Sequence, residues 1–331
     1  MPTTPPISRR GALSALAVLT VATASASWAV EEASWPNKQI RLIVPYPPGG
    51  SADTLGRALS FALGKAFGQS VVVENRAGAS GMIGSQAVSR AEPDGYTLVI
   101  SGIGSHVIAP KLTPSSFDPI KDFTHIALLG GPPTVLVVNA EGPVKDMQGF
   151  ISYAKDKPGG VSWGSPGQGT HGSLIGEAFA QATGLTMVQA PYKGANAAVT
   201  DLIANQIQAA FITLSSAMPG LKSGRLRAIA LTADSRLDDF PDVPTFKELG
   251  YPRLTGTTWF SLSGPPGMRD TVVTRINQAV RDALRTPEVR KELRQQNMVT
   301  EDMDASAFTR YVQSELEHWT PFLTPLEKTQ P

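Results

Sequence analysis

The segment from residue 40 to residue 66 constrains the fold most, because it joins a strand to a helix through a turn of prolines and glycines. The run Ile40–Val44 is typical of a buried strand and stops at Pro45, and the turn Pro-Pro-Gly-Gly follows at 47–50. Apolar residues then recur at the spacing of one helical face, namely Leu55, Leu59, Ala62, Leu63 and Ala66. A strand–turn–helix unit of this kind indicates an α/β fold.

This first turn predicts an anion-binding site. Its glycines let the backbone approach whatever lies at the strand end, and Ser51 or Asp53 can cap the helix. The N–H groups at an open helix N-terminus have no intrahelical partner and lie at the positive end of the helix dipole. We therefore place Tyr46, Gly49, Gly50, Ser51 and Asp53 in the candidate site.

A second turn of the same design lies in the other half of the chain. The strand 161–164 is followed by Ser-Pro-Gly-Gln-Gly-Thr-His at 165–171 and then by a helical pattern. From this turn we add Ser165, Gly167, Gly169, Thr170 and His171 to the candidate site. Two such turns, one in each half, predict a ligand that is held from both sides.

Other strand ends supply the remaining candidate residues, which are Ser101, Gly104, Ser105, Tyr192, Gly194 and Thr213. Several candidates have a second interpretation. Tyr46 and Tyr192 either contact the ligand or pack with only the hydroxyl in water. His171 either binds the ligand or begins a helix at the surface. Asp53 complements the dipole of its own helix, orients a water, or pairs with the ammonium group of an amino-acid ligand.

The organisation of the chain predicts two lobes. Strand and helix patterns alternate along most of its length, which favours parallel sheets with helices on both faces. Gly/Pro-rich segments at 128–133 and 256–266 flank apolar strands, and only helical patterns follow the second segment. We therefore predict one lobe of residues 30–130 plus 256–331 and a second lobe of residues 131–255. About 300 residues suffice for two domains with full cores.

The first 29 residues are predicted to be a signal peptide. Arg9 and Arg10 precede an apolar run at 11–24 that is too short to span a bilayer, and small residues follow it. The Ser-Arg-Arg sequence at 8–10 is compatible with the twin-arginine route. No later stretch reaches about 18 uninterrupted apolar residues. The sequence thus predicts a soluble, exported protein.

Composition argues against several classes of site. Cysteine is absent, so neither disulfides nor thiolate metal sites are expected. The 29 Lys and Arg residues nearly balance 28 Asp and Glu residues without a basic run, so nucleic acid is not an expected partner. The four histidines lack the spacing of a metal site. We expect no cofactor.

Two sequence motifs resemble catalytic signatures but fail in their context. Residues 167–172 spell G-x-G-x-x-G, yet Gln189 and Ala190 stand where a dinucleotide-binding domain needs an acidic residue. Residues 160–164 spell G-x-S-x-G, yet Ser162 lies early in a strand and not at the strand-to-helix turn. We therefore expect a binding protein and not an enzyme. The alternative from another class is a secreted hydrolase that acts on a small carboxylate or ester.

The string Pro-Tyr-Pro-Pro-Gly-Gly-Ser-Ala-Asp at 45–53 resembles the first signature of the Bug-type extracytoplasmic solute receptors. These are the substrate-binding proteins of tripartite tricarboxylate transporters. The similarity continues in order through 71–84, 93–98, 121–123, 164–170, 191–194, 226–230 and 240–245. The resemblance implies a type II periplasmic binding protein (a Venus flytrap) with two α/β lobes joined by crossing strands.

The resemblance also implies a function. Such a receptor is periplasmic, closes on a small carboxylate and delivers it to the membrane permease subunits of the transporter. The ligand is held mainly by backbone N–H groups, hydroxyls and waters, and it is a di- or tricarboxylate, an aromatic carboxylate or an amino acid. We expect a monomer. The chain departs from the family pattern at Ser173, where the family often carries histidine.

Overall fold

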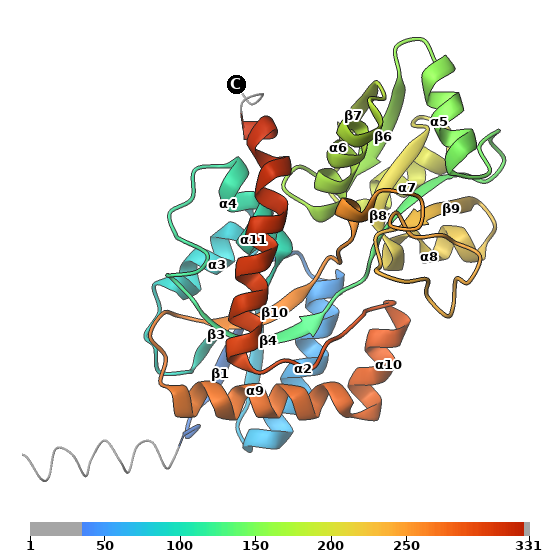
Figure 1. Cartoon of the computed structure of the whole chain (residues 1–331). Helices are drawn as coiled ribbons and strands as arrows, with labels where there is room; N and C mark the ends of the chain where they lie inside the picture. The colour runs from blue at the N-terminus through green and yellow to red at the C-terminus, as the bar shows by residue number, and fades with distance from the viewer. Residues whose placement is uncertain (1–34, 328–331) are drawn as a thin grey trace, which may run out of the picture.

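The computed structural model describes residues 35–327, which form two α/β lobes, each built on a five-stranded sheet (Figure 1). The predicted signal peptide lies outside the described residues. The first sheet has the order β2-β1-β3-β10-β4, with β1 (Ile40–Val44), β2 (Val71–Asn75), β3 (Thr97–Gly102), β4 (Thr124–Gly130) and β10 (Phe260–Gly264). The second has the order β7-β6-β8-β5-β9, with β5 (Thr134–Asn139), β6 (Val161–Ser165), β7 (Met187–Pro191), β8 (Ala209–Thr213) and β9 (Leu226–Leu231). The predicted two-lobed α/β fold is confirmed.

Both sheets follow one plan, which corrects the prediction of parallel sheets. In the first sheet β1 pairs in parallel with β2 and β3, whereas β10 pairs antiparallel with β3 and β4. In the second sheet β6 pairs in parallel with β7 and β8, whereas β5 pairs antiparallel with β8 and β9. The antiparallel strand in each sheet enters directly from the other lobe, so each lobe is completed by a crossing strand. The residue limits of the two lobes stay a prediction.

Helices cover the sheets of both lobes. The first sheet is accompanied by α2 (Ser51–Phe67), α3 (Met82–Ser89), α4 (Ala109–Leu112), α9 (Asp270–Arg285), α10 (Pro287–Gln295) and α11 (Ala305–Glu327). The second is accompanied by α5 (Met147–Asp156), α6 (His171–Thr183), α7 (Ala195–Ile203) and α8 (Leu214–Lys222). Three short turns complete the described chain, η1 (Ala79–Gly81), η2 (Gly104–Ile108) and η3 (Pro252–Leu254). In the described part of the chain, no helix combines the length and apolarity that crossing a bilayer requires.

One apolar cluster joins the two lobes. It includes Leu128 and Trp259 beside the first sheet, Phe179 and Phe246 beside the second, and Trp319 on α11. Helix α11 packs against β4 and α4 of the first lobe and also against α6 of the second. In Figure 1 this helix rises from the level of α9 to the level of α6. Burial of apolar surface therefore holds the lobes together, in addition to the two chain segments that pass between them. These segments, which lead from β4 into β5 and from β9 into β10, are called the crossing connections below.

A buried chain of hydroxyls fixes the position of the crossing strand β10. The Oγ of Ser101 on β3 lies 2.7 Å from that of Ser261 and 2.8 Å from that of Ser263 on β10. His125 on β4 places Nδ1 3.2 Å from the Oγ of Ser263 and Nε2 3.0 Å from the carbonyl of Pro119. Because a carbonyl only accepts, Nε2 donates, and Nδ1 of a neutral His125 accepts from Ser263. Ser101, a predicted ligand residue, is fully buried within this chain.

We predict that His125 makes stability depend on pH. Burial lowers its pKa from 6.5 to about 4, against the opposing effect of the Pro119 carbonyl. The unfolded chain therefore binds the proton first, and stability is lost as pH falls below 6.5. Between pH 7.5 and pH 5 this group costs about 2 kcal/mol. Urea unfolding at both pH values should show a loss smaller by about that amount in His125→Gln, and an equal loss in both proteins would contradict the assignment.

Candidate ligand-binding site

The first turn leaves the start of α2 open. Gly50 is the N-cap of α2 and no side chain caps the helix, so the prediction that Ser51 or Asp53 does so is wrong. The first N–H groups of α2 are therefore without a capping acceptor, which is the arrangement that suits an anion. Gly49 has a φ of +82°, which favours glycine, whereas Gly50 has a φ of −82° that any residue adopts. Glycine is needed for its backbone conformation at 49 and not at 50.

Asp53 organises this turn. Its Oδ2 accepts from the N–H of Gly49 at 2.9 Å and from Nε of Arg57 at 3.0 Å, while its Oδ1 accepts from Asn75 Nδ2 at 2.9 Å. The Asn75 amide also donates to the carbonyl of Tyr46 at 3.2 Å. Burial raises the pKa of Asp53, but these three donors outweigh it and the net pKa is lowered. Both carboxylate oxygens are thus used inside the turn, which favours the structural interpretation of Asp53.

The second turn is held by its own hydroxyls. Thr170 caps α6 by accepting from the N–H of Ser173 at 3.3 Å, and it donates to the carbonyl of Gly167 at 2.7 Å. Ser165 Oγ accepts from Gln189 Nε2 at 2.9 Å. Gly167 and Gly169 have φ values of +133° and +73°. Side-chain bonds and left-handed glycines therefore define the shape of this turn before any ligand binds.

The lobes touch through a third turn, at 78–81, which is not among the predicted site residues. Ser80 Oγ donates to the carbonyl of Gln168 at 3.1 Å, across 88 positions of sequence and from one lobe to the other. The segment 78–81 has positive φ at every residue, with values of 137°, 46°, 54° and 94°. Ala79 and Ser80 are not glycines, so this backbone is strained. The flanking Gly78 and Gly81 are the sequence signal that pointed to a special backbone here.

The phenol of Tyr46 marks where the turns converge. A Cβ built on Gly81 would lie 3.2 Å from the Tyr46 hydroxyl and 2.9 Å from Ser105 Cβ. One built on Gly104 would lie 3.5 Å from that hydroxyl and 3.5 Å from the carbonyl oxygen of Gly169. Burial raises the pKa of Tyr46, and hydrogen bonds from Ser105 only partly offset this, so the phenol keeps its proton and is a donor at neutral pH. Of the predicted residues, the structure gathers Tyr46, Gly104, Ser105 and Gly169.

The remaining candidates in the second lobe lie at its strand ends with their polar groups already paired. The Tyr192 hydroxyl donates to Asp201 at 2.7 Å, and burial together with this carboxylate raises its pKa to about 12. Gly194 donates its N–H to the carbonyl of Pro166 at 3.0 Å. Thr213 Oγ1 lies 2.8 Å from Ser216 Oγ at the start of α8. Their contact with a ligand stays a prediction.

His171 is not a surface residue, so that interpretation is wrong. It is 1% exposed, and its Nδ1 lies 3.1 Å from the hydroxyl of Thr134 and 3.1 Å from that of Thr258, which belong to the two crossing connections. The ring packs edge-on against Trp319 at 5.3 Å. Burial lowers its pKa to about 3. His171 therefore joins the crossing connections to α11.

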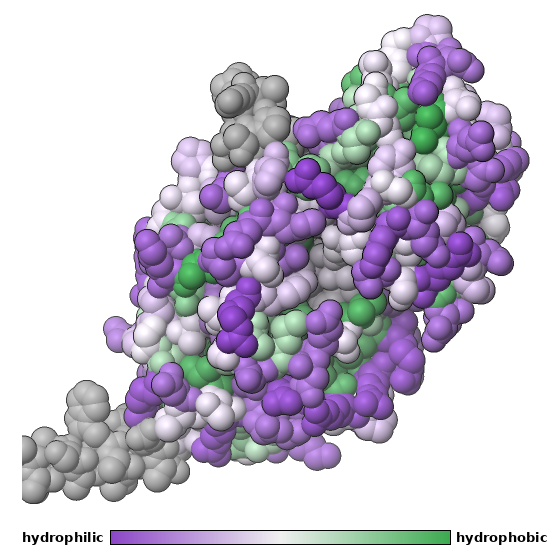
Figure 2. Space-filling model, viewed as in Figure 1, coloured by the Kyte–Doolittle hydropathy of each residue, from purple (hydrophilic) through white to green (hydrophobic). Residues whose placement is uncertain are grey.

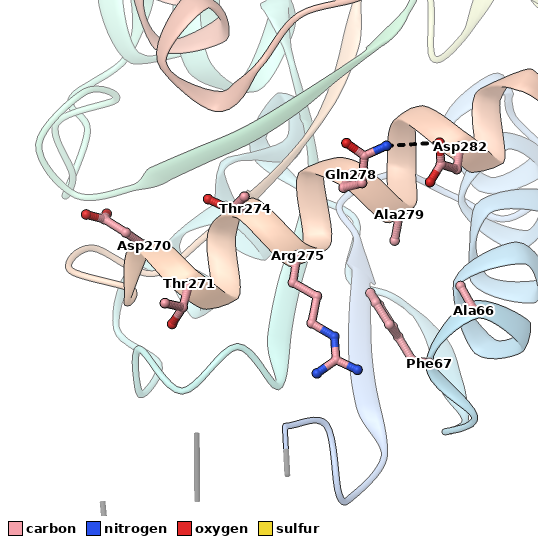
Figure 3. A pocket seen from close by; sticks show the side chains of 9 residues that line it. All are labelled: Ala66, Phe67, Asp270, Thr271, Thr274, Arg275, Gln278, Ala279 and Asp282. Atoms are coloured by element: carbon pink, nitrogen blue, oxygen red, sulfur yellow. Dashed lines mark hydrogen bonds between the residues drawn. The ribbon is translucent and has the colours of Figure 1, made fainter. Parts of the chain in front are cut away.

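A groove of about 750 Å³ lies elsewhere, between the end of α2 and α9 (Figure 3). Phe67 and Arg275 face each other across it, and the Arg275 guanidinium is held by the carbonyl of Trp35. The groove contains none of the candidate residues and is not assigned to ligand binding. Within residues 35–327, no group of three or more His, Asp or Glu side chains is placed to hold a metal ion.

Residues 55–327 match the family described as "Tripartite tricarboxylate transporter family receptor". The chain belongs to this family. BugT of Bordetella pertussis is 32% identical to this receptor over 301 residues, which cover 90% of the receptor and 92% of BugT. An R. palustris protein solved with adipate superposes with a TM-score of 0.80 at 30% identity, covering 88% and 98% of the two chains. MatC from Rhodopseudomonas palustris with bound malate gives 0.78 at 28% identity, covering 87% and 100%.

We predict that Asp53→Ala destabilises the receptor without ligand. The substitution removes a buried carboxylate and leaves the N–H of Gly49 and the amide of Asn75 without their acceptor in a partly exposed turn, which costs about 1–2 kcal/mol. Urea unfolding of the free protein measures the effect. Asp238→Ala is the control, because that carboxylate is exposed. If both variants unfold like the parent, Asp53 does not organise the turn.

Proposed function

We propose that this receptor binds a small dicarboxylate between its lobes and delivers it in the periplasm to the membrane permease of a tripartite transporter. The observation that carries the proposal is the contact between Ser80 and Gln168, which brings the turns of both lobes to one place beside Tyr46. Family membership supports the same function. The dicarboxylates bound by two related structures, malate and adipate, support the ligand class.

The chemistry of the turns supports recognition by backbone and hydroxyl groups. The segments 45–53, 78–81, 104–105 and 165–170 contain no Lys or Arg. An anion at their junction is therefore held by N–H groups such as those at the open start of α2, and by neutral donors such as the Tyr46 phenol. Each hydrogen bond to a charged group contributes about 1.5–3 kcal/mol. Four or five of them that form only when both lobes contact the ligand stabilise closure by more than the roughly 5.5 kcal/mol that reverses a 99:1 population.

The alternative function, hydrolysis, has less support from the positions of the candidate serines. Ser162 lies inside β6 and donates to Gln208 Oε1 at 2.9 Å, so it does not occupy a nucleophile elbow. The Oγ of Ser105 does lie 3.0 Å from Nδ1 of His106. However, the His106 ring packs against Phe117 and Phe123, and among the described residues no carboxylate is hydrogen-bonded to it. Without such an acid, His106 is not oriented as the base that would activate Ser105.

We predict that dicarboxylates of four to six carbons raise the melting temperature and that Gly169→Val abolishes the effect. A Cβ at this position would lie 3.0 Å from Ser80 Oγ, so the larger side chain prevents the turns of the two lobes from meeting. Binding at a hundredfold excess over Kd stabilises the folded protein by about 2.7 kcal/mol. Thermal shift with succinate, malate and adipate measures it.

Gly184→Val is the matched control. Gly184 has a φ of +65°, close to the +73° of Gly169, so valine strains the backbone at both positions. It ends α6 in open space, away from the turns. The control should lose stability but keep its ligand-dependent shift. Equal ligand shifts in both variants, or none in the parent protein, would contradict the proposed site.

A further inference from the structure

A second cavity lies in the first lobe, next to the segment where the chain leaves β4 for the second lobe. It has a volume of about 310 Å³ and is enclosed by α9, α10 and the segment 298–303. Figure 2 shows that the face over α9 and α10 is mostly hydrophilic. The cavity wall is different, because it combines five apolar side chains with a ring of charged ones. The apolar residues are Leu128, Leu284, Leu293, Met298 and Met303.

The charged residues of this cavity are mainly arginines. Arg281, Arg285, Arg290 and Arg294 line it together with Glu301 and Asp302. Asp302 accepts from Nη2 of Arg281 at 3.0 Å and from Nη2 of Arg285 at 2.6 Å. Within the described chain, Arg290 and Arg294 take part in no ion pair. The cavity therefore has an excess of positive charge beside an apolar floor.

The wall of the cavity is continuous with the crossing connection. Val299 and Gly131 exchange two backbone hydrogen bonds, each 3.0 Å long. Gly130 has a φ of +97°, and a Cβ on it would lie 2.4 Å from the carbonyl oxygen of Val299. Leu128, on the cavity floor, precedes these glycines on β4. The wall of the cavity is therefore hydrogen-bonded directly to the point where the chain passes between the lobes.

We propose that this cavity is a second binding site, for a small organic anion with an apolar body, and that its occupancy biases the arrangement of the lobes. The unpaired guanidinium groups attract the anionic head, and the Leu and Met side chains pack against the body. The volume lies at the lower end of the range for small-molecule sites. A ligand that fits one arrangement of the 298–303 segment better than another shifts the lobe equilibrium by that difference.

The test uses hexanoate as the probe and the methionine methyl groups as reporters. Met298 and Met303 line the cavity, whereas Met147 is buried in the other lobe. In methyl NMR of the receptor without other ligands, hexanoate should shift Met298 and Met303 saturably and leave Met147 in place. The backbone amide of Gly131 should shift at the same concentrations. A shift of the methyl groups without Gly131 would overturn the link to the lobes.

Three controls keep this site separate from the one between the lobes. The double variant Arg290→Gln, Arg294→Gln should weaken hexanoate binding about tenfold, because both charges are exposed and need no partner for folding. Arg310→Gln removes an exposed arginine on α11 that does not line the cavity, and it should change nothing. Gly169→Val should still bind hexanoate in this cavity, with an affinity changed only by the effect of the substitution on the lobe equilibrium. Unchanged affinity in the double variant would overturn the proposal.

Discussion

The close approach of three backbone segments behind the lobes is the constraint on which the rest of the structure depends. A Cβ on Gly131 would lie 2.2 Å from the carbonyl oxygen of Thr258, and one on Gly130 would lie 2.4 Å from that of Val299. Only glycines allow both crossing connections and the 299–300 segment to lie side by side. From this point β5 enters one sheet and β10 the other, each as an interior strand. Neither sheet is complete without the crossing.

The apolar cluster along α11 contains the contacts that must break if the two lobes separate. Trp259 and Trp319 both donate to the Glu315 carboxylate, at 2.7 Å and 3.3 Å. Burial raises the pKa of Glu315, against the effect of these two indoles. Arg253 of η3 lies over the Phe322 ring at 4.6 Å. Because α11 contacts both lobes, a hinge motion cannot occur in the crossing connections alone, and α11 must slide on one lobe as they separate.

Local sequence patterns predicted the elements well, because strand and helix periodicity and Gly/Pro turns depend on neighbouring residues. The turns after β1 and β6 were visible in this way. The mixed pairing of each sheet was not, since it depends on β10 and β5 entering from the other lobe. The apolar periodicity of a strand indicates which of its faces is buried. It does not indicate whether the adjacent strands in the sheet run parallel or antiparallel to it.

The candidate site was less predictable for the same physical reason. The role of Asp53 depends on Asn75, 22 positions away, and that of His171 on Thr258, 87 positions away. Ser80 meets Gln168 across 88 positions, so no local pattern reveals their contact. Glycine content located the turns correctly, whereas the orientation of their polar side chains depends on partners that only the fold brings near.

The strained turn at 78–81 is held in place by neutral contacts, and one of these contacts reaches the other lobe. Left-handed conformations at Ala79 and Ser80 cost about 1–3 kcal/mol each, and they persist only where surrounding contacts over-determine the backbone. Gly81 is confined by Tyr46 and Ser105, and Ser80 finds its acceptor on the other lobe. The bond from Ser80 to Gln168 alone contributes about 1 kcal/mol, less than the strain. Under the proposed function, a ligand that contacts both lobes beside this turn adds hydrogen bonds that the lobes do not make with each other.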